Sequence, residues 1–238
     1  MREILLGGLK VRLVGGFDGQ GGGDGPLVML LHGFGAPGDD LVPLADVIEA
    51  PRGTRWLFPE APLSLNMGLG DSRAWWIIDF GRIQEDRAAG RIRDLSIEIP
   101  QGLALARERM LVFLKELPRQ IQINYKKTVI GGFSQGAMLT CDAVLHTDYP
   151  FTGLVQLSGN LLAREVWSPL MSKRKGLPVF QSHGTLDDIL PHVGAERLRG
   201  ALSESGLAVE WLSFRGGHEI PEPVLQRLGV FITQRLSA

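Results

Sequence analysis

A serine, an aspartate and a histidine that stand far apart in the chain are the residues best suited to chemistry. Ser134 lies at the centre of Gly132-Phe133-Ser134-Gln135-Gly136, and Asp187 and His218 follow later. A serine hydroxyl is a poor nucleophile at neutral pH, so a base must take its proton as it attacks a carbonyl carbon. Histidine can accept that proton and return it to the leaving group, while a carboxylate orients the imidazole. We therefore predict Ser134 as the nucleophile, His218 as the general base and Asp187 as the residue that orients it.

The residues around Ser134 predict a strand, a sharp turn and a helix. A β-branched run over 128–130 leads into the serine motif, and an apolar stretch with helical character follows it. This is the context of a strained nucleophile turn, in which glycines two positions before and after the serine remove Cβ atoms that would collide. The motif also occurs by chance in a chain with 31 glycines, so its assignment depends on the acid and the histidine that follow.

The acid has an alternative in Asp188, which a shift of one residue would bring forward. The spacing from the preceding glycine favours Asp187. His183, Asp187, Asp188 and His192 also have the residue types of a metal site, but a proline between the histidines prevents a helix that would align them. We therefore expect no metal here. We expect His183, like His32, to brace a loop by hydrogen bonds.

A glycine-rich loop, His32-Gly33-Phe34-Gly35-Ala36-Pro37-Gly38, follows the apolar run 27–31. Its glycines fit the spacing of a dinucleotide-binding loop, which would indicate a nicotinamide-binding oxidoreductase. Asp39-Asp40 disfavours this interpretation, because two carboxylates would stand where the pyrophosphate must bind. The alternative is that backbone N–H groups of the loop stabilise a developing oxyanion. On that interpretation the donors are Phe34 and Gln135.

Strands and helices alternate along the rest of the chain. The expected strands lie at 26–31, 54–58, 128–130, 151–157, 177–182 and 207–214, and the expected helices at 39–49, after Ser134, and at 100–117, 193–205 and 221–236. Two apolar runs around Gly7-Gly8 predict a hairpin at the edge of a sheet. The pattern predicts an α/β fold, a doubly wound and mostly parallel sheet with helices on both faces and an N-terminal antiparallel hairpin, in one domain over 1–238. Parallel strands end at one edge of a sheet, so the three candidate residues can meet there.

Large apolar side chains gather in the connection 63–80, after the carboxyl end of a predicted strand. We predict Leu65, Met67, Trp75 and Trp76 as a substrate pocket, since ligands bind at that edge of open α/β sheets. Plain core packing is the alternative. Residues 81–96 carry both signs of charge and are expected to form a solvated surface excursion, with a mobile lid as the alternative.

Charge and composition restrict the class of partner. A formal net charge of -1 and a pI near 6.5 offer no basic field for nucleic acid. The chain has no run of 18 apolar residues and no apolar leader, so we expect no integral membrane association and a cytoplasmic location. Cys141 is the one cysteine, which excludes an internal disulfide and a cysteine-rich zinc site.

Taken together, these motifs resemble the phospholipase/carboxylesterase family of α/β hydrolases, which includes acyl-protein thioesterases and bacterial carboxylesterases. The matching segments are Leu31-His32-Gly33-Phe34-Gly35, Phe58-Pro59-Glu60-Ala61-Pro62, Arg73-Ala74-Trp75-Trp76, Gly131-Gly132-Phe133-Ser134-Gln135-Gly136-Ala137, Leu157-Ser158-Gly159, His183-Gly184-Thr185-Leu186-Asp187 and Gly217-His218-Glu219-Ile220-Pro221. The chain departs from the family at its paired tryptophans, where a single tryptophan followed by phenylalanine or tyrosine and an aspartate is more usual.

The resemblance implies a cofactor-free serine esterase of α/β-hydrolase fold, with Ser134, Asp187 and His218 as its triad and Phe34 and Gln135 at its oxyanion hole. We predict hydrolysis of a small-molecule carboxylic ester through an acyl-serine intermediate, with thioesters and lysophospholipids as further substrate classes. A non-catalytic ligand-binding protein on the same fold is the alternative from another class. The sequence leaves a homodimer open.

Overall fold

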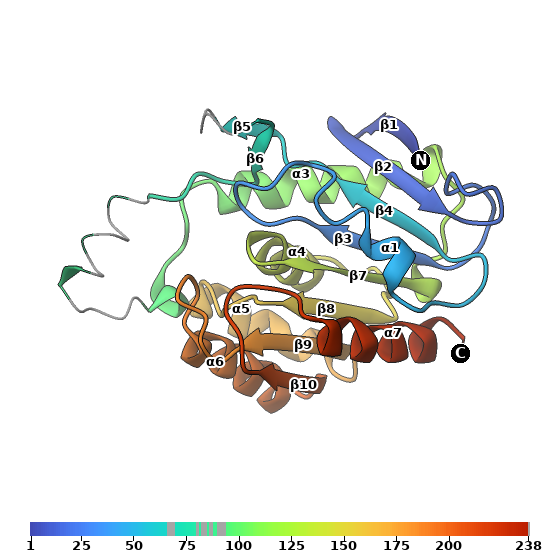
Figure 1. The fold of residues 1–238 in the computed structure, drawn as a ribbon. Coiled ribbons are helices and arrows are strands. Elements are labelled where there is room, and N and C mark those ends of the chain that lie inside the picture. Colours follow the sequence, from blue (N-terminus) through green and yellow to red (C-terminus); the bar gives the residue numbers. More distant parts are fainter. Residues whose placement is uncertain (66–69, 80, 82–84, 86–87, 90–93, 238) are drawn as a thin grey trace.

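The computed structural model describes residues 1–237 except 66–69, 80, 82–84, 86–87 and 90–93. Within these residues an eight-stranded sheet has the order β1-β2-β4-β3-β7-β8-β9-β10 (Figure 1). Its strands are β1 (Arg2–Leu6), β2 (Leu9–Gly15), β3 (Leu27–Leu31), β4 (Arg55–Pro59), β7 (Thr128–Phe133), β8 (Gly153–Leu157), β9 (Pro178–Gly184) and β10 (Ala208–Phe214). Within this sheet the strands β4, β3, β7, β8, β9 and β10 are parallel, and β2 joins them antiparallel through β4. The predicted mostly parallel α/β sheet is confirmed.

The first two strands form the predicted hairpin at the edge of this sheet. Leu6 of β1 pairs with Leu9 of β2, and Gly7 and Gly8 between them have φ values of 55° and 78°. These left-handed conformations are cheap for glycine and strained for other residues. The glycine pair therefore permits the tight return of the chain.

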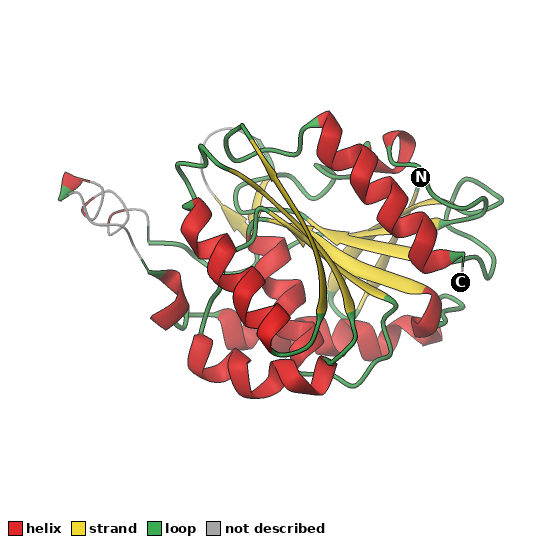
Figure 2. Cartoon of the chain, turned by 90° about the horizontal axis from the view of Figure 1, so that it is seen from below, coloured by secondary structure: helices red, strands yellow, loops and turns green. Residues whose placement is uncertain are grey.

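Helices cover both faces of the sheet (Figure 2). The α-helices named here are α1 (Leu44–Val47), α3 (Leu103–Glu116), α4 (Gln135–Leu145), α5 (Arg164–Met171), α6 (His192–Glu204) and α7 (Glu222–Leu236). On β3, Met29 belongs to the buried cluster beneath α3 and α4, whereas Val28 belongs to the cluster beneath α7. Successive strand residues point to opposite faces, so a strand covered on both sides is apolar throughout. The single domain over 1–238 stays a prediction.

One expectation about local structure was wrong, and two elements were not predicted. The helix predicted over 39–49 is only α1, because Pro43 at its N-cap lacks an N–H and disfavours helical conformation in the residue before it. The eight-residue α5 was not predicted, since Pro169 lies inside it. A small ribbon of β5 (Leu63–Leu65) and β6 (Ser72–Ala74) was also missed. No helix in the described part of the chain is long and apolar enough to cross a membrane.

Candidate active site

Ser134 occupies a strained turn between β7 and α4, with φ 53° and ψ −118°. A residue other than glycine in such a conformation costs about 1 to 3 kcal/mol and persists only where its surroundings enforce it. The Ser134 N–H donates to the carbonyl of Leu157 at 2.8 Å. A Cβ atom on Gly132 or Gly136 would overlap the carbonyl oxygen of Leu31 on the neighbouring strand. The two glycines therefore let strand and helix close around the serine, as the sequence predicts.

The histidine and the acid come from adjacent strands. Asp187 follows β9, His218 follows β10, and Nδ1 of His218 lies 2.7 Å from Oδ2 of Asp187. Because a carboxylate only accepts hydrogen bonds, Nδ1 carries the proton, and in the neutral ring Nε2 presents its lone pair. The neighbouring Asp188 is exposed. The geometry thus pairs His218 with Asp187, the acid that its spacing from Gly184 favours.

Four donors surround the Asp187 carboxylate. Its Oδ1 accepts from the N–H groups of Ile189 at 2.9 Å and Leu190 at 2.8 Å, and its Oδ2 faces His183 Nε2 at 3.2 Å as well as His218. Burial would raise the pKa of Asp187, but the hydrogen bonds from His183, His218 and the Leu190 backbone outweigh it and hold that pKa well below its usual value. The carboxylate is therefore charged at neutral pH.

His183 is fully buried beside this carboxylate. Its Nε2–H is shared between the carbonyl of Leu190 at 2.7 Å and Oδ2 of Asp187 at 3.2 Å, and its Nδ1 has no hydrogen-bond partner among the described residues. The predicted bracing of the loop is confirmed. The contact with Asp187 was not predicted, although the four-residue spacing from His183 to the acid was visible in the sequence.

The glycine-rich loop after β3 passes directly over the nucleophile. A Cβ atom added to Gly33 would lie 3.3 Å from Cβ of Ser134. His32 fixes the loop, because its Nδ1 donates to the Gly33 carbonyl at 2.8 Å and its Nε2 accepts from the N–H of Ala61 at 3.0 Å. Burial lowers the pKa of His32, and the bond to Gly33 only partly opposes this. The loop is thus braced by a neutral imidazole.

Gln135 connects the serine turn to the wall of the site. Its backbone N–H is in the first turn of α4 and has no acceptor within the helix. Its side chain accepts from the N–H of Trp75 at 2.9 Å and donates to the carbonyl of Trp76 at 2.8 Å. The Trp75 indole donates in turn to the His32 carbonyl at 3.0 Å. Sequence reasoning placed these residues in one site but missed this clamp.

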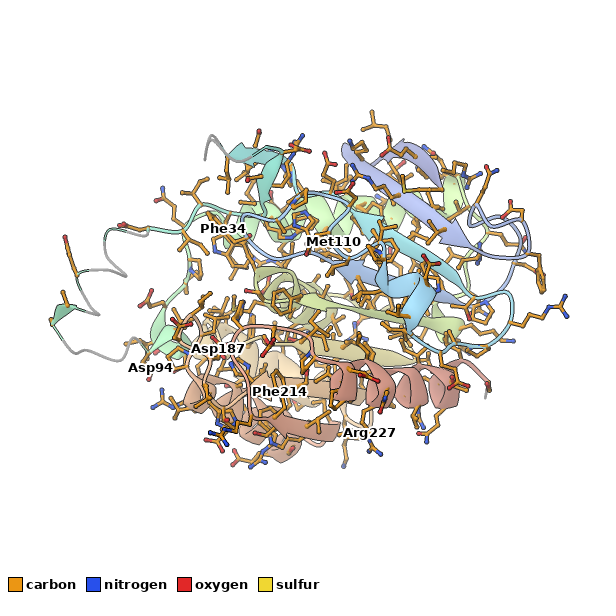
Figure 3. All side chains as sticks on the ribbon, viewed as in Figure 1. Phe34, Asp94, Met110, Asp187, Phe214 and Arg227 are labelled. Carbon is orange, nitrogen blue, oxygen red and sulfur yellow. The ribbon has the colours of Figure 1, made fainter. Side chains whose placement is uncertain are left out.

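Ser134 and His218 open into one cavity of about 1100 Å³, which Phe34 and Gln135 also line. The hydrogen bonds of the described residues include none between the Ser134 hydroxyl and His218. Such bonds are often long without substrate and shorten in the complex. Phe34 and Asp187 lie at the same end of the sheet (Figure 3).

Trp75 and Trp76 line this cavity, whereas Leu65 is not among its described lining residues and Leu63 is. A role of the two tryptophans in binding substrate stays a prediction. The register of the β5–β6 ribbon explains the difference between the two leucines. Leu63 pairs with Ala74, the residue before Trp75, whereas Leu65 pairs with Ser72, two residues further from Trp75. Met67 lies outside the described residues, as does much of the charged segment 81–96. The other apolar lining residues among those described are Ile77, Ile78, Leu95, Ile99, Pro100, Leu105, Ala106, Met138, Leu162, Ile189 and Leu190.

The glycine-rich loop lacks the helix that a dinucleotide site requires. The next helix, α1, begins only at Leu44 and has 4 residues, too few to direct a helix N-terminus at a pyrophosphate. Glu60, the acidic residue about twenty positions on, is buried against Lys10 at 3.1 Å and Arg12 at 2.8 Å. Both features disfavour nicotinamide binding.

Among the described residues no three His, Cys, Asp or Glu side chains are grouped to hold a metal.

Comparison with known proteins agrees with this geometry. The sequence profile of a family described as Phospholipase/Carboxylesterase matches residues 22–236. Acyl-protein thioesterase 1 of Eremothecium gossypii is 29% identical over 221 residues, which cover 88% of each protein. The crystal structure of esterase PE8 is similar with a TM-score of 0.77 and 26% identity, over 94% of this chain and 97% of that one. The Bacillus cereus carboxylesterase, at 20% identity, shares the fold with a TM-score of 0.70 over 95% and 94% of the two chains. The chain belongs to the phospholipase/carboxylesterase family of α/β hydrolases, enzymes that act on ester bonds.

Proposed function

We propose that the chain is a serine carboxylesterase that cleaves its substrate through an acyl-Ser134 intermediate. The observation that carries the proposal is the joint opening of a strained Ser134 and of His218, paired with Asp187 at 2.7 Å, into one cavity. A positive φ at a non-glycine residue marks stored strain, which is concentrated at functional sites. The family membership supports the same chemistry.

In the proposed reaction the Ser134 hydroxyl attacks the carbonyl carbon while His218 Nε2 takes its proton. Asp187 orients the imidazole and stabilises the imidazolium without taking the proton. The backbone N–H groups of Phe34 and Gln135 stabilise the oxyanion, and losing one such donor typically costs about 2.7 to 4 kcal/mol. His218 then protonates the departing alcohol or thiol. Water, activated by the same imidazole, releases the acid from Ser134.

The walls of the cavity favour an apolar acyl group. Trp75, Trp76 and Met138 surround the space beside Ser134, and Ile99 and Leu105 are exposed where the lining reaches solvent. Apolar surface covered by an acyl chain contributes about 25 cal/mol per Å². Esters with an apolar acyl chain are therefore the proposed class, and thioesters and lysophospholipids present the same carbonyl to Ser134.

A fluorophosphonate probe tests the proposal directly. We expect it to add its mass at Ser134, and we expect Ser134→Ala to lose labelling and about 10⁴-fold or more of its turnover of p-nitrophenyl esters. Ser203→Ala, at an exposed serine of α6, is the matched control and should behave as the parent protein. A chain that binds such esters but takes up no probe and turns nothing over would instead be the non-catalytic ligand-binding protein.

A further inference from the structure

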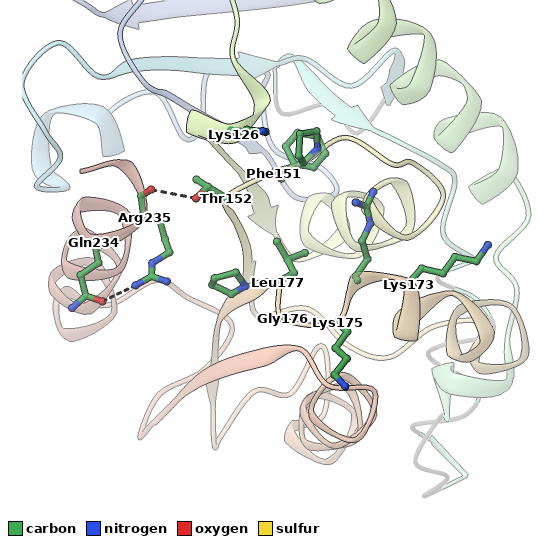
Figure 4. A pocket seen from close by; sticks show the side chains of 12 residues that line it. Lys126, Phe151, Thr152, Lys173, Lys175, Gly176, Leu177, Gln234 and Arg235 are labelled. Atoms are coloured by element: carbon green, nitrogen blue, oxygen red, sulfur yellow. Dashed lines mark hydrogen bonds between the residues drawn. The ribbon is translucent and has the colours of Figure 1, made fainter. Parts of the chain in front are cut away.

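A second concave site lies at the opposite edge of the sheet. It has a volume of about 480 Å³ and is formed where β8 and β9 begin and α7 ends. Figure 4 shows Lys126, Arg235 and Lys175 on different sides of Leu177, with the side chains of Lys175 and Lys173 extending away from it. The active-site cavity shares no lining residue with this site. We call it the basic pocket.

All charged side chains that line the basic pocket are positive. Its lining includes five basic side chains and no aspartate or glutamate: Lys126, Lys173, Arg174, Lys175 and Arg235. In the part of the chain that the structure describes, none of the five forms an ion pair, although cations elsewhere do, such as Arg197 with Asp94 at 2.7 Å. Asp148, which is not in the lining, is the acid that acts on Arg174. A chain of net charge -1 thus gathers five cations, none of them in an ion pair among the described residues, in one hollow.

Helix dipoles do not account for these cations. The basic residues lie in or next to the last turns of three helical segments: α7, Tyr125–Lys127 and Ser172–Arg174. Cations at C-terminal ends are stabilising, because each end carries roughly half a negative charge. Tyr125–Lys127 is a 3-10 turn of 3 residues, too short for its peptide dipoles to sum to that charge, and Ser172–Arg174 continues α5. The two remaining ends, those of α7 and of α5 with its extension, amount to about −1 charge, which five cations exceed. A net positive field therefore remains for a ligand.

Two of the cations are fixed in place by the fold. The Arg174 guanidinium donates to the carbonyls of Val144 at 2.8 Å, Tyr149 at 3.0 Å and Thr147, so its charge is held by neutral acceptors. The Arg235 guanidinium donates to Oε1 of Gln234 at 3.5 Å and lies 5.9 Å from the centroid of the Phe231 ring, while its buried Nε has no hydrogen-bond partner among the described residues. Positions held this way lose little side-chain entropy when an anion binds.

We propose that the basic pocket binds a phosphate group, carried either by a soluble phosphate ester or by a lipid headgroup. Lys126, Lys175 and Arg235 supply the ammonium and guanidinium donors, while Arg174 supplies fixed positive charge. Phe151 and Leu177 give the pocket an apolar part that suits the organic portion of an ester. This inference does not depend on the proposed ester hydrolysis, because the two sites are separate.

The test uses the full chain and two phosphate probes. Inorganic pyrophosphate is titrated by calorimetry at low ionic strength, and vesicles of phosphatidylcholine with and without phosphatidylglycerol are used in sedimentation. We expect the double variant Lys126→Glu/Lys175→Glu to raise the Kd for the bound probe about tenfold or more, with ester turnover unchanged. Binding of pyrophosphate alone identifies a soluble phosphate ligand, and binding of anionic vesicles alone identifies a headgroup.

A matched control separates the pocket from general charge. Lys115→Glu/Arg164→Glu reverses two exposed cations outside the basic pocket and should leave the Kd within about twofold of the parent value. Binding of neither probe would overturn the proposal. An equal loss of binding in both double variants would also overturn it, since the effect would then come from net charge.

Discussion

Nε2 of His183 lies 3.2 Å from Oδ2 of Asp187, the carboxylate oxygen that also faces His218 at 2.7 Å. Two imidazoles thus approach one oxygen, that of His183 from strand β9 and that of His218 from the loop after β10. The buried His183 can fix the direction of the carboxylate although it does not reach the cavity. This makes it a positioning residue for the proposed triad.

Replacing His183 by leucine is expected to lower kcat about ten- to hundredfold with little change in KM. A hydrogen bond to a charged group contributes about 1.5 to 3 kcal/mol, and here that energy orients the acid. His183→Gln should recover part of the loss, because its amide N–H can replace Nε2–H. Steady-state kinetics on p-nitrophenyl esters measures both constants, and a leucine variant with parental kcat would contradict the assignment.

Asp187→Asn should lower kcat about 10⁴-fold, because an amide in place of the carboxylate no longer holds His218 in the reactive tautomer. Asp188→Asn provides the matched control at the next position, where the side chain is exposed, and should change kcat less than about threefold. Reversed effects in the same assay would assign the acid to Asp188. Circular dichroism should show both variants folded.

Gly136→Ala should destabilise the protein by about 2 kcal/mol or more, because the new Cβ would overlap the backbone carbonyls of Leu31 and His32. Gly200→Ala in α6 is the comparison, since no atom lies within 4 Å of the added Cβ. Alanine there should raise the free energy of unfolding by up to about 1 kcal/mol. Urea denaturation measures both, and equal stability of the two variants would contradict the packing argument.

The free energy of unfolding should fall as the pH decreases below 6.5, the ordinary pKa of histidine. Burial lowers the folded-state pKa of His32, so below 6.5 the unfolded chain binds more protons than the folded one. The pKa of Asp187 is also lowered, but its contribution is lost only below its ordinary value of 3.8. Denaturation at about pH 5 and about pH 8 should therefore differ less in His32→Asn than in the parent. An identical difference would exclude His32 as the source.

Turnover should increase with the length of the acyl chain. Each buried methylene contributes about 0.8 kcal/mol, so kcat/KM should rise about threefold to fourfold per carbon until the apolar walls are covered. A p-nitrophenyl ester series from acetyl to palmitoyl measures this. A maximum at acetyl would show that the 1100 Å³ cavity does not hold the acyl group.

The sheet and the pairing of His218 with Asp187 could be predicted because the ends of strands and the glycines of tight turns are recognisable from short stretches of sequence. The strand over 128–130 and the glycines around Ser134 correspond to β7 and its turn. The contact of Gln135 with the backbone of Trp75 joins residues 60 positions apart, which no local pattern encodes, whereas the four-residue spacing of His183 and Asp187 alone does not predict that their side chains meet. Helix length after the glycine-rich loop was misjudged, since Pro43 limits α1 despite an amphipathic pattern.

The clamp between Gln135 and the backbone of Trp75 and Trp76 has a consequence for altering selectivity. A substitution that reshapes the tryptophan wall to admit another acyl group also changes the hydrogen bonds of Gln135, the first residue of α4, which directly follows the nucleophile. Selectivity and rate therefore cannot be tuned independently here. Libraries that seek new substrates should vary Gln135 together with the wall.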